Sequence, residues 1–161
     1  MQPSNLDSNL KQFLVTIDDK VAMLEAIAKL KLVQYSTNAD ALVTALANDV
    51  SYDVATALST VLHQENPPSF SEIETWLTHL PVISLSLSFA PSRIQLQAYQ
   101  EILQTEGKHP TVLLQVSVNP HLLAGVQVEI NGTYRDYSLQ TALDSFVQTP
   151  AYQAILTKHL Q

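Results

Sequence analysis

Residues 119–139, NPHLLAGVQVEINGTYRDYSL, contain the pattern that decides the fold of this chain. Between Val126 and Asn131 apolar and polar residues alternate, which is typical of a strand with one buried face. Asn131-Gly132 follows, and both residue types accept the positive φ of a tight hairpin turn. TYRDY forms the returning arm, and Ser138 is suited to cap a helix over LQTALDSFV. The stretch therefore predicts a β-hairpin that leads into a helix.

The residues before this hairpin predict a strand, a helix and a second strand. In VISLSLSFA (82–90) apolar and serine residues alternate, and the expected buried positions are Ile83, Leu85, Leu87 and Phe89. RIQLQAYQEILQTEGK (93–108) predicts a helix with one apolar face formed by Ile94, Ala98, Ile102 and Leu103. TVLLQVSV (111–118) is short and rich in branched residues, which indicates a largely buried strand.

The first 80 residues predict helices only. Apolar residues recur at alternating steps of four and three, at Leu10, Leu14, Ile17, Val21, Leu24 and Ala28. This stripe is either an ordinary core face or a seam for a partner helix, and Asp18-Asp19 could divide the segment into two helices. Further helices are expected over residues 39–49, 51–64 and 70–80. The last of these follows a capping-box pattern, Ser69 with Glu72.

Together these elements predict an α+β protein. A helical bundle over residues 1–80 precedes a small β-α-β-β-α domain over residues 81–161, which ends in terminal helices. Pro81 marks the expected boundary, and Thr149-Pro150 is expected to start a last helix over residues 151–160.

Composition excludes several classes of function. The 161 residues carry a formal net charge of −7, which argues against a grip on nucleic acid phosphates or anionic lipid. There is no cysteine, and no apolar run reaches the length of a membrane span. The start of the chain lacks the features of a signal peptide, so a soluble intracellular protein is expected.

No catalytic, cofactor-binding or metal site is predicted. None of the five histidines stands three or four residues from another, and the chain has no glycine-rich phosphate loop or nucleophile elbow. Asn131-Gly132-Thr133 matches a glycosylation sequon but is interpreted only as a turn. The sequence therefore offers no residue on which an enzymatic function could rest.

The segment VLLQVSVNPHLLAGVQVEIN (112–131) resembles the signature of the delta subunit of F-type ATP synthases, the oligomycin-sensitivity-conferring protein family. The resemblance extends over residues 82–143. The positions that match the family motif are Asn119, Pro120, Leu122, Ala124, Gly125, Gly132, Asp136 and Ser138. Gly125 is expected to allow a close backbone approach or a bend, and Gly132 to supply the turn.

The sequence departs from the family pattern in three places. Ala124 replaces a glycine, Tyr137 replaces the glycine between Asp136 and Ser138, and the arginine that often follows the serine is absent. Residues 1–80 match poorly, since the family has about six helices there.

The resemblance implies a stator subunit that links the catalytic head to the peripheral stalk and resists torque. Its implied partners are the alpha-subunit N-terminal peptide and the b subunit, and its implied place is peripheral, at the cytoplasmic face of the energy-transducing membrane. Residues proposed for the head contact are Phe13, Leu32 and Tyr35, and those proposed for the stalk contact are Phe146, Tyr152 and Ile155. For each, an ordinary core position is the alternative. The competing function is a non-catalytic adaptor unrelated to ATP synthase.

Overall fold

The computed structural model describes residues 6, 10–34, 51–63, 67–107, 111–150 and 152. Within them the chain forms five helices and four strands, which confirms the predicted mixture of helices with a small sheet. Contacts divide the chain into two units, which we call the helical unit (residues 1–82 and 96–114) and the sheet unit (residues 83–95 and 115–161). The bundle over residues 1–80 and the boundary at Pro81 stay predictions. The helices expected over residues 39–49 and 151–160 lie outside the described residues, apart from Tyr152.

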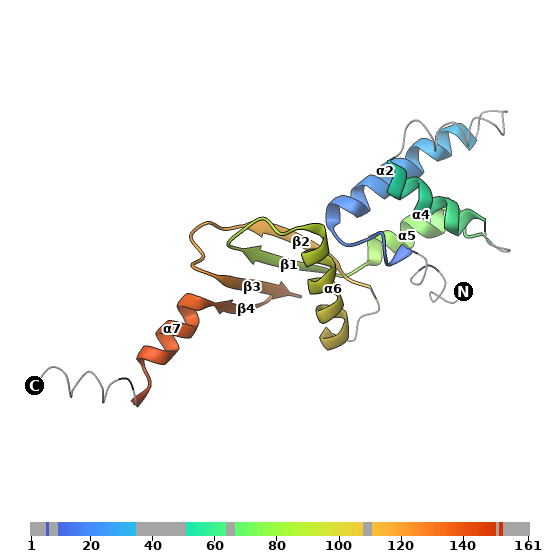
Figure 1. Ribbon diagram of the computed structural model, residues 1–161. Coiled ribbons are helices and arrows are strands. Elements are labelled where there is room, and N and C mark those ends of the chain that lie inside the picture. Colours follow the sequence, from blue (N-terminus) through green and yellow to red (C-terminus); the bar gives the residue numbers. More distant parts are fainter. Residues whose placement is uncertain are drawn as a thin grey trace, which may run out of the picture. The chain divides into compact units, whose positions relative to one another are not determined.

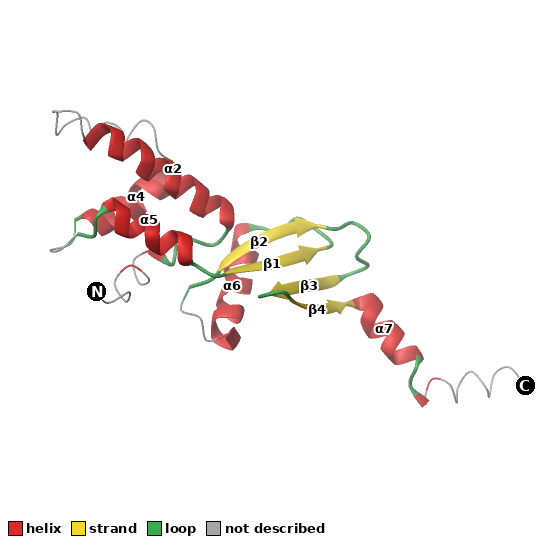
Figure 2. Ribbon diagram, turned by 180° about the vertical axis from the view of Figure 1, so that it is seen from behind, coloured by secondary structure: helices red, strands yellow, loops and turns green. Residues whose placement is uncertain are grey.

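Three helices of the helical unit pack around one apolar core (Figures 1 and 2). They are α2 (Ile17–Gln34), α4 (Tyr52–Leu62) and α5 (Phe70–His79). The core side chains from these helices are Met23, Ala26, Ile27, Leu30, Val54, Ala57, Leu58, Val61, Ile73 and Leu77. Burying a side chain of this size stabilises the fold by about 1.5–3 kcal/mol, so this core accounts for the packing of the three helices.

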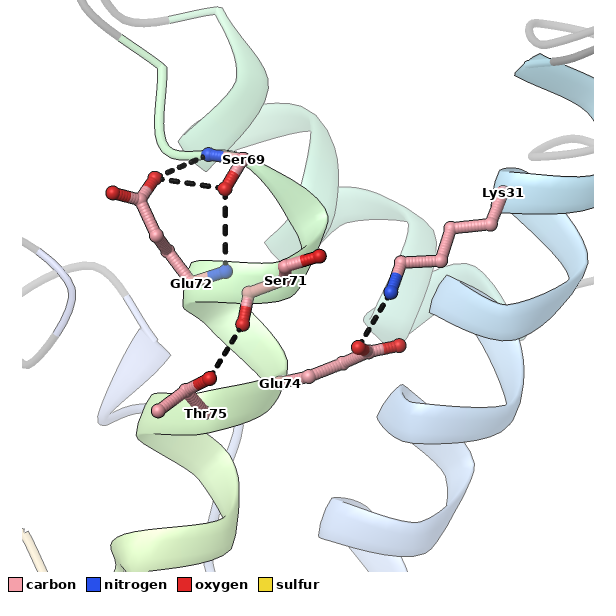
Figure 3. A network of polar contacts seen from close by, with 6 residues as sticks. All are labelled: Lys31, Ser69, Ser71, Glu72, Glu74 and Thr75. Atoms are coloured by element: carbon pink, nitrogen blue, oxygen red, sulfur yellow. Dashed lines mark hydrogen bonds and ion pairs between the residues drawn. The ribbon is translucent and has the colours of Figure 1, made fainter.

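Polar contacts fix the start of α5 and its position against α2 (Figure 3). The Ser69 hydroxyl accepts a hydrogen bond from the Glu72 backbone N–H, and the Glu72 carboxylate accepts one from the Ser69 N–H at 2.8 Å. The predicted capping box is thus confirmed. The Lys31 ammonium forms an ion pair with Glu74, which joins α2 to α5.

The segment before α2 is not a continuation of that helix. Thr16 and Asp19 form a second reciprocal cap, in which the Asp19 carboxylate accepts from the Thr16 N–H and the Thr16 hydroxyl accepts from the Asp19 N–H. Asp19 also accepts from the Val15 N–H. The chain is thus not helical between residues 11 and 16, and Asp18 and Asp19 do not interrupt a helix but lie in the first turn of α2. Leu10 and Leu14 are buried in the segment before the helix.

The predicted core stripe is wrong for α2 itself. Val21 is 46% exposed and Ala28 is exposed, whereas Met23 and Ile27 are buried. The helix starts at Ile17 and not at Leu10, so the repeat that begins at Leu10 does not run along a single helix. The buried side of α2 is the one that packs against α4 and α5.

The four strands form one mixed sheet in the order β2-β1-β3-β4 (Figure 1). They are β1 (Val82–Leu87), β2 (Leu113–Val118), β3 (Gly125–Ile130) and β4 (Thr133–Ser138). β3 is antiparallel to both β1 and β4. The Leu113 N–H donates to the Pro81 carbonyl and the Asn119 N–H donates to the Leu87 carbonyl, so β1 and β2 advance in the same direction. A parallel pair needs a crossover, which α6 (Arg93–Gly107) provides.

Alternation in β1 is as predicted up to Leu87. Ile83, Leu85 and Leu87 are buried, and the serines between them are half-buried. Phe89 is 44% exposed because the strand ends at Leu87, so its predicted place on the buried face is wrong.

The predicted apolar face of α6 is also wrong. Ile94 is 79% exposed and Ile102 is 55% exposed, whereas Gln100 and Gln104 are buried. The physical reason lies in the Gln100 amide, which donates to the carbonyls of Leu14 at 2.6 Å and Val112 at 2.7 Å. Buried carbonyl groups need donors, and this side chain supplies one to each.

Candidate partner-binding site

Three of the motif residues, Ala124, Gly125 and Ser138, meet where β3 begins, β4 ends and the next helix starts. Gly125 pairs with Ser138 across the two strands, and the Leu139 N–H donates to the Ala124 carbonyl at 2.9 Å. Gly125 has φ +95°, and a Cβ there would lie 2.3 Å from the Tyr137 carbonyl oxygen. No larger residue fits this backbone approach without moving β4.

The other motif residues form two turns. At the first turn the Asn119 side-chain oxygen accepts from the His121 N–H at 3.0 Å, Pro120 lies within the turn and Leu122 is buried. At the hairpin, Asn131 has φ +50° and Gly132 has φ +74°, with Ile130 paired to Thr133. Positive φ at both central residues is the geometry of a two-residue hairpin turn.

Asp136 holds the end of β4 in place. Its carboxylate accepts hydrogen bonds from the Ser138 N–H at 2.7 Å and from the Gln127 side-chain amide at 2.9 Å. The hydroxyl of Ser138, its backbone N–H and the Gln127 amide together lower the pKa of Asp136 to about 2. Ser138 in turn accepts from the Thr141 N–H and so caps the helix α7 (Leu139–Val147). Hydrogen bonds to the ionised carboxylate therefore fix the strand end from which α7 leaves.

Acid is expected to loosen this junction. Because the pKa of Asp136 is lower in the folded protein than its ordinary value of 3.8, its contribution to stability is complete above that value and is lost as the pH falls toward 2. A carboxyl ¹³C NMR titration should give a midpoint near 2. The stability lost through Asp136→Asn should be larger at pH 7 than at pH 2.5, as measured by thermal unfolding.

Asp144→Asn, which removes an exposed carboxylate from α7, is the control for this comparison. An Asp136 midpoint close to 4 would contradict the assignment of these hydrogen bonds.

α7 presents an apolar face that the described residues of its own unit leave exposed. Both views show the helix leaving the end of β4 and extending away from the sheet (Figures 1 and 2). The side chains of this α7 face recur at steps of four, three and one, and each is 41% to 54% exposed: Leu139, Leu143, Phe146 and Val147. Such spacing places them on one side of a helix, the arrangement with which helices dock into partner grooves.

Among the residues proposed for the stalk contact, Phe146 belongs to the α7 face. Its ring lies 5.4 Å from the ring of Tyr152, which extends the aromatic surface beyond the helix. Ile155 lies outside the described residues. Leu139, Leu143 and Val147 were not predicted as contact residues, although their spacing is visible in the sequence. The sequence alone does not show that α7 packs so little against the sheet.

Of the three residues proposed for the head contact, two lie in the described part of the chain. Phe13 is half-buried and packs against the core of the helical unit. Leu32, on α2, is 76% exposed. Tyr35 lies outside the described residues.

Two other kinds of site are absent from the described residues. Among them no group of three or more His, Asp and Glu side chains is placed to hold a metal ion. None of their helices has both the length and the apolar character of a membrane-crossing helix.

Residues 83–149 match the model of the family described as ATP synthase delta (OSCP) subunit. The resemblance is confirmed over this segment. It begins in β1, includes α6 and the hairpin, and ends just beyond α7, so the Gly125 junction and the α7 face both lie within it. No curated protein is matched by the chain. The matched family consists of non-catalytic, peripheral subunits of ATP synthase, and the match supports a general role in its stator.

Proposed function

We propose that this protein is a stator subunit that ties the catalytic head of a rotary ATP synthase to the b-subunit stalk. Rotation inside the head exerts torque, and the head would turn with the rotor unless a peripheral link held it. Such a link needs two binding surfaces and no active site. Two linked contacts also strengthen each other, since the first raises the effective concentration of the second.

The observation that carries this proposal is the match to residues 83–149, which ends with the exposed α7 face. We assign the b subunit to this face, with Phe146 and Tyr152 at its far end. The alpha-subunit N-terminal peptide is assigned to residues 1–80, where Leu32 is 76% exposed and is the more exposed of the two described residues proposed for this contact. The protein then acts as a peripheral subunit at the cytoplasmic face of the energy-transducing membrane.

Co-purification tests the proposal as a whole. Tagged protein expressed in its native cells should bring down the alpha, beta and b subunits in a fixed ratio. Recovery without any synthase subunit would favour the alternative, an adaptor that shares only this segment with the family. The alternative is supported by one observation, namely that residues 1–82 lie outside the matched segment.

The double change Leu143→Ala and Phe146→Ala should weaken binding of the extramembrane b subunit by about 10- to 100-fold, or about 1.4–2.8 kcal/mol. Both side chains are about half exposed in the isolated chain, so the thermal midpoint should change little. Isothermal titration calorimetry and thermal unfolding measure the two effects.

Gln140→Ala on the same helix is the matched control and should leave the affinity unchanged. Unaltered b-subunit affinity in the double variant would remove α7 from the stalk contact. A large loss of stability would show that these side chains serve the core instead.

A further inference from the structure

The apolar face of the sheet is covered unequally from strand to strand. On β1 it carries Ile83, Leu85 and Leu87, none of which is more than 3% exposed. Cross-strand pairing continues this face over β3 and β4, and we call that part the β3–β4 surface: Val126, Val128, Ile130, Thr133, Arg135 and Tyr137. Of these side chains only Val128 is buried, and Tyr137 is 58% exposed. The apolar face is therefore covered over β1 and largely open over β3 and β4.

A second open apolar surface adjoins this one. The α7 face begins two residues after Tyr137, and its four side chains are about half exposed. The charges also suit each other, since Arg135 belongs to the β3–β4 surface and Asp144 is the charged residue of α7. Two neighbouring apolar surfaces gain free energy when each removes the other from water. Because α7 follows β4 directly, turning α7 back onto the sheet would cover both surfaces.

The dimensions of the two surfaces agree. A helix advances about 1.5 Å per residue, so the first and last residues of α7 are about 12 Å apart along its axis. A strand advances about 3.4 Å per residue, so Tyr137 and Thr133 are about 14 Å apart along β4. If α7 were turned back along β4, Leu143 would lie over Arg135 and Val147 would lie near Thr133.

Few contacts hold the joint between β4 and α7. The Leu139 N–H donates to the Ala124 carbonyl, and the Ser138 hydroxyl accepts from the Thr141 N–H. The carboxylate of Asp136 holds the strand as far as the Ser138 N–H. A change of backbone direction at Leu139 would break its bond to Ala124 and would leave the bond between Asp136 and Ser138 intact. The helix therefore has a hinge at Leu139 that does not disturb the hairpin.

We propose that α7 alternates between the extended position of this structure and a closed position, in which it lies back along β4 with the α7 face against the β3–β4 surface. The closed position hides the side chains assigned to the b subunit, so closure competes with that contact and shields the α7 face before assembly. The b subunit then binds the extended fraction of the protein. The regulatory part of this inference rests on the proposed function, whereas the closed position itself does not.

Engineered disulfides detect the closed position, because the chain has no cysteine of its own. Thr133→Cys with Val147→Cys joins the end of α7 to the β3–β4 surface. Glu129→Cys with Val147→Cys is the control, since Glu129 stands between Val128 and Ile130 in β3 and so points to the opposite face. With oxidised glutathione, the first pair should form its intramolecular disulfide at least about tenfold faster, because closure raises the effective concentration of the two thiols.

Non-reducing electrophoresis and mass spectrometry of the full chain measure these rates. Equal rates for the two pairs would overturn the proposal. Disulfides formed mainly between two chains would overturn it as well, since they would show that α7 covers a second copy instead of its own sheet.

A further pair of variants tests which side of α7 faces the sheet. Added to the first cysteine pair, Leu143→Asp should slow the intramolecular disulfide about tenfold, because closure would bury a carboxylate against apolar side chains. Ser145→Asp adds the same charge on the other side of α7 and should leave the rate unchanged. Both positions are exposed in the extended helix, and circular dichroism establishes that both variants are folded. If the two variants form the disulfide at the same rate, α7 does not close through its apolar face and the proposal fails.

Binding of the extramembrane b subunit tests the regulation. The chain locked by Thr133→Cys and Val147→Cys should bind it at least about tenfold more weakly than the same chain after reduction. Equal binding of the two forms would overturn the competition. If the reduced chain does not bind the b subunit and co-purification recovers no synthase subunit, the stator function fails. The disulfide rates involve no synthase component, so they decide separately whether α7 closes.

Discussion

Gly125→Ala is expected to destabilise the protein by more than about 4 kcal/mol, a size of effect that few single substitutions reach. The new Cβ would lie 2.3 Å from the Tyr137 carbonyl oxygen and 2.9 Å from the Ser138 Cα. Both are backbone atoms, so relief requires β4 to move away from β3, which breaks the pairing of Gly125 with Ser138. Alanine at φ +95° adds backbone strain of about 1–3 kcal/mol. Chemical denaturation monitored by circular dichroism measures the change.

Gly132→Ala is the matched control for this prediction. Gly132 also has positive φ, +74°, but a Cβ there would meet no atom within 4 Å. Its substitution therefore introduces only conformational strain, about 1–2 kcal/mol. Equal losses for the two variants would show that the close approach of Gly125 to β4 is unimportant. Hydrogen exchange of the β3 amides distinguishes local opening at the junction from loss of the whole hairpin.

The hairpin could be predicted because its determinants are adjacent in the chain. Asn131-Gly132 specifies the turn, and the alternation after Gly125 specifies the register once that turn is fixed. The distance from Gly125 to Tyr137 could not be obtained in this way, since it depends on the pairing of two strands. The same limit applies to Asp136, whose partner Gln127 lies on the neighbouring strand.

Periodicity gave the wrong faces for α2 and α6 for a common reason. Each helix carries apolar residues on more than one side, so spacing alone does not select the side that is buried. In α2 the packing of α4 and α5 selects Met23 and Ile27. In α6 a polar side chain, Gln100, takes a buried position because two backbone carbonyls need its hydrogen atoms. Hydropathy patterns assign glutamine to the surface and miss such a position.

The candidate sites show a similar division. Motif residues such as Gly125 and Asp136 could be selected from the sequence because a family signature contains them. The exposed α7 face became visible only with the structure, since its spacing alone equally suits a helix packed on the sheet. Residues 1–82 lie outside the segment matched to the family, and their proposed binding role rests on the exposure of side chains such as Leu32.

Gln100→Leu is the second substitution for which a large loss of stability is expected. Leucine has nearly the same volume but no donor, so the carbonyls of Leu14 and Val112 lose the bonds that Gln100 gives them. Each buried acceptor left without a partner costs about 1–3 kcal/mol, which predicts a total of about 2–5 kcal/mol. The loss should appear in thermal unfolding. It should also increase hydrogen exchange at Leu114, whose N–H donates to the Val15 carbonyl close to this contact.

Gln104→Leu provides a control of opposite sign on the same side of α6. Gln104 lies one turn after Gln100 and is 9% exposed, and its side-chain nitrogen has no hydrogen-bond partner among the described residues. Leucine there removes a buried, unsatisfied donor and leaves every backbone carbonyl as it was, so the protein should keep or gain stability, by up to about 2 kcal/mol. Equal destabilisation by the two substitutions would show that this face of α6 contributes to stability through side-chain volume and not through hydrogen bonding. Opposite signs would instead establish that Gln100 holds the segment before α2 against the start of β2 through its two hydrogen bonds.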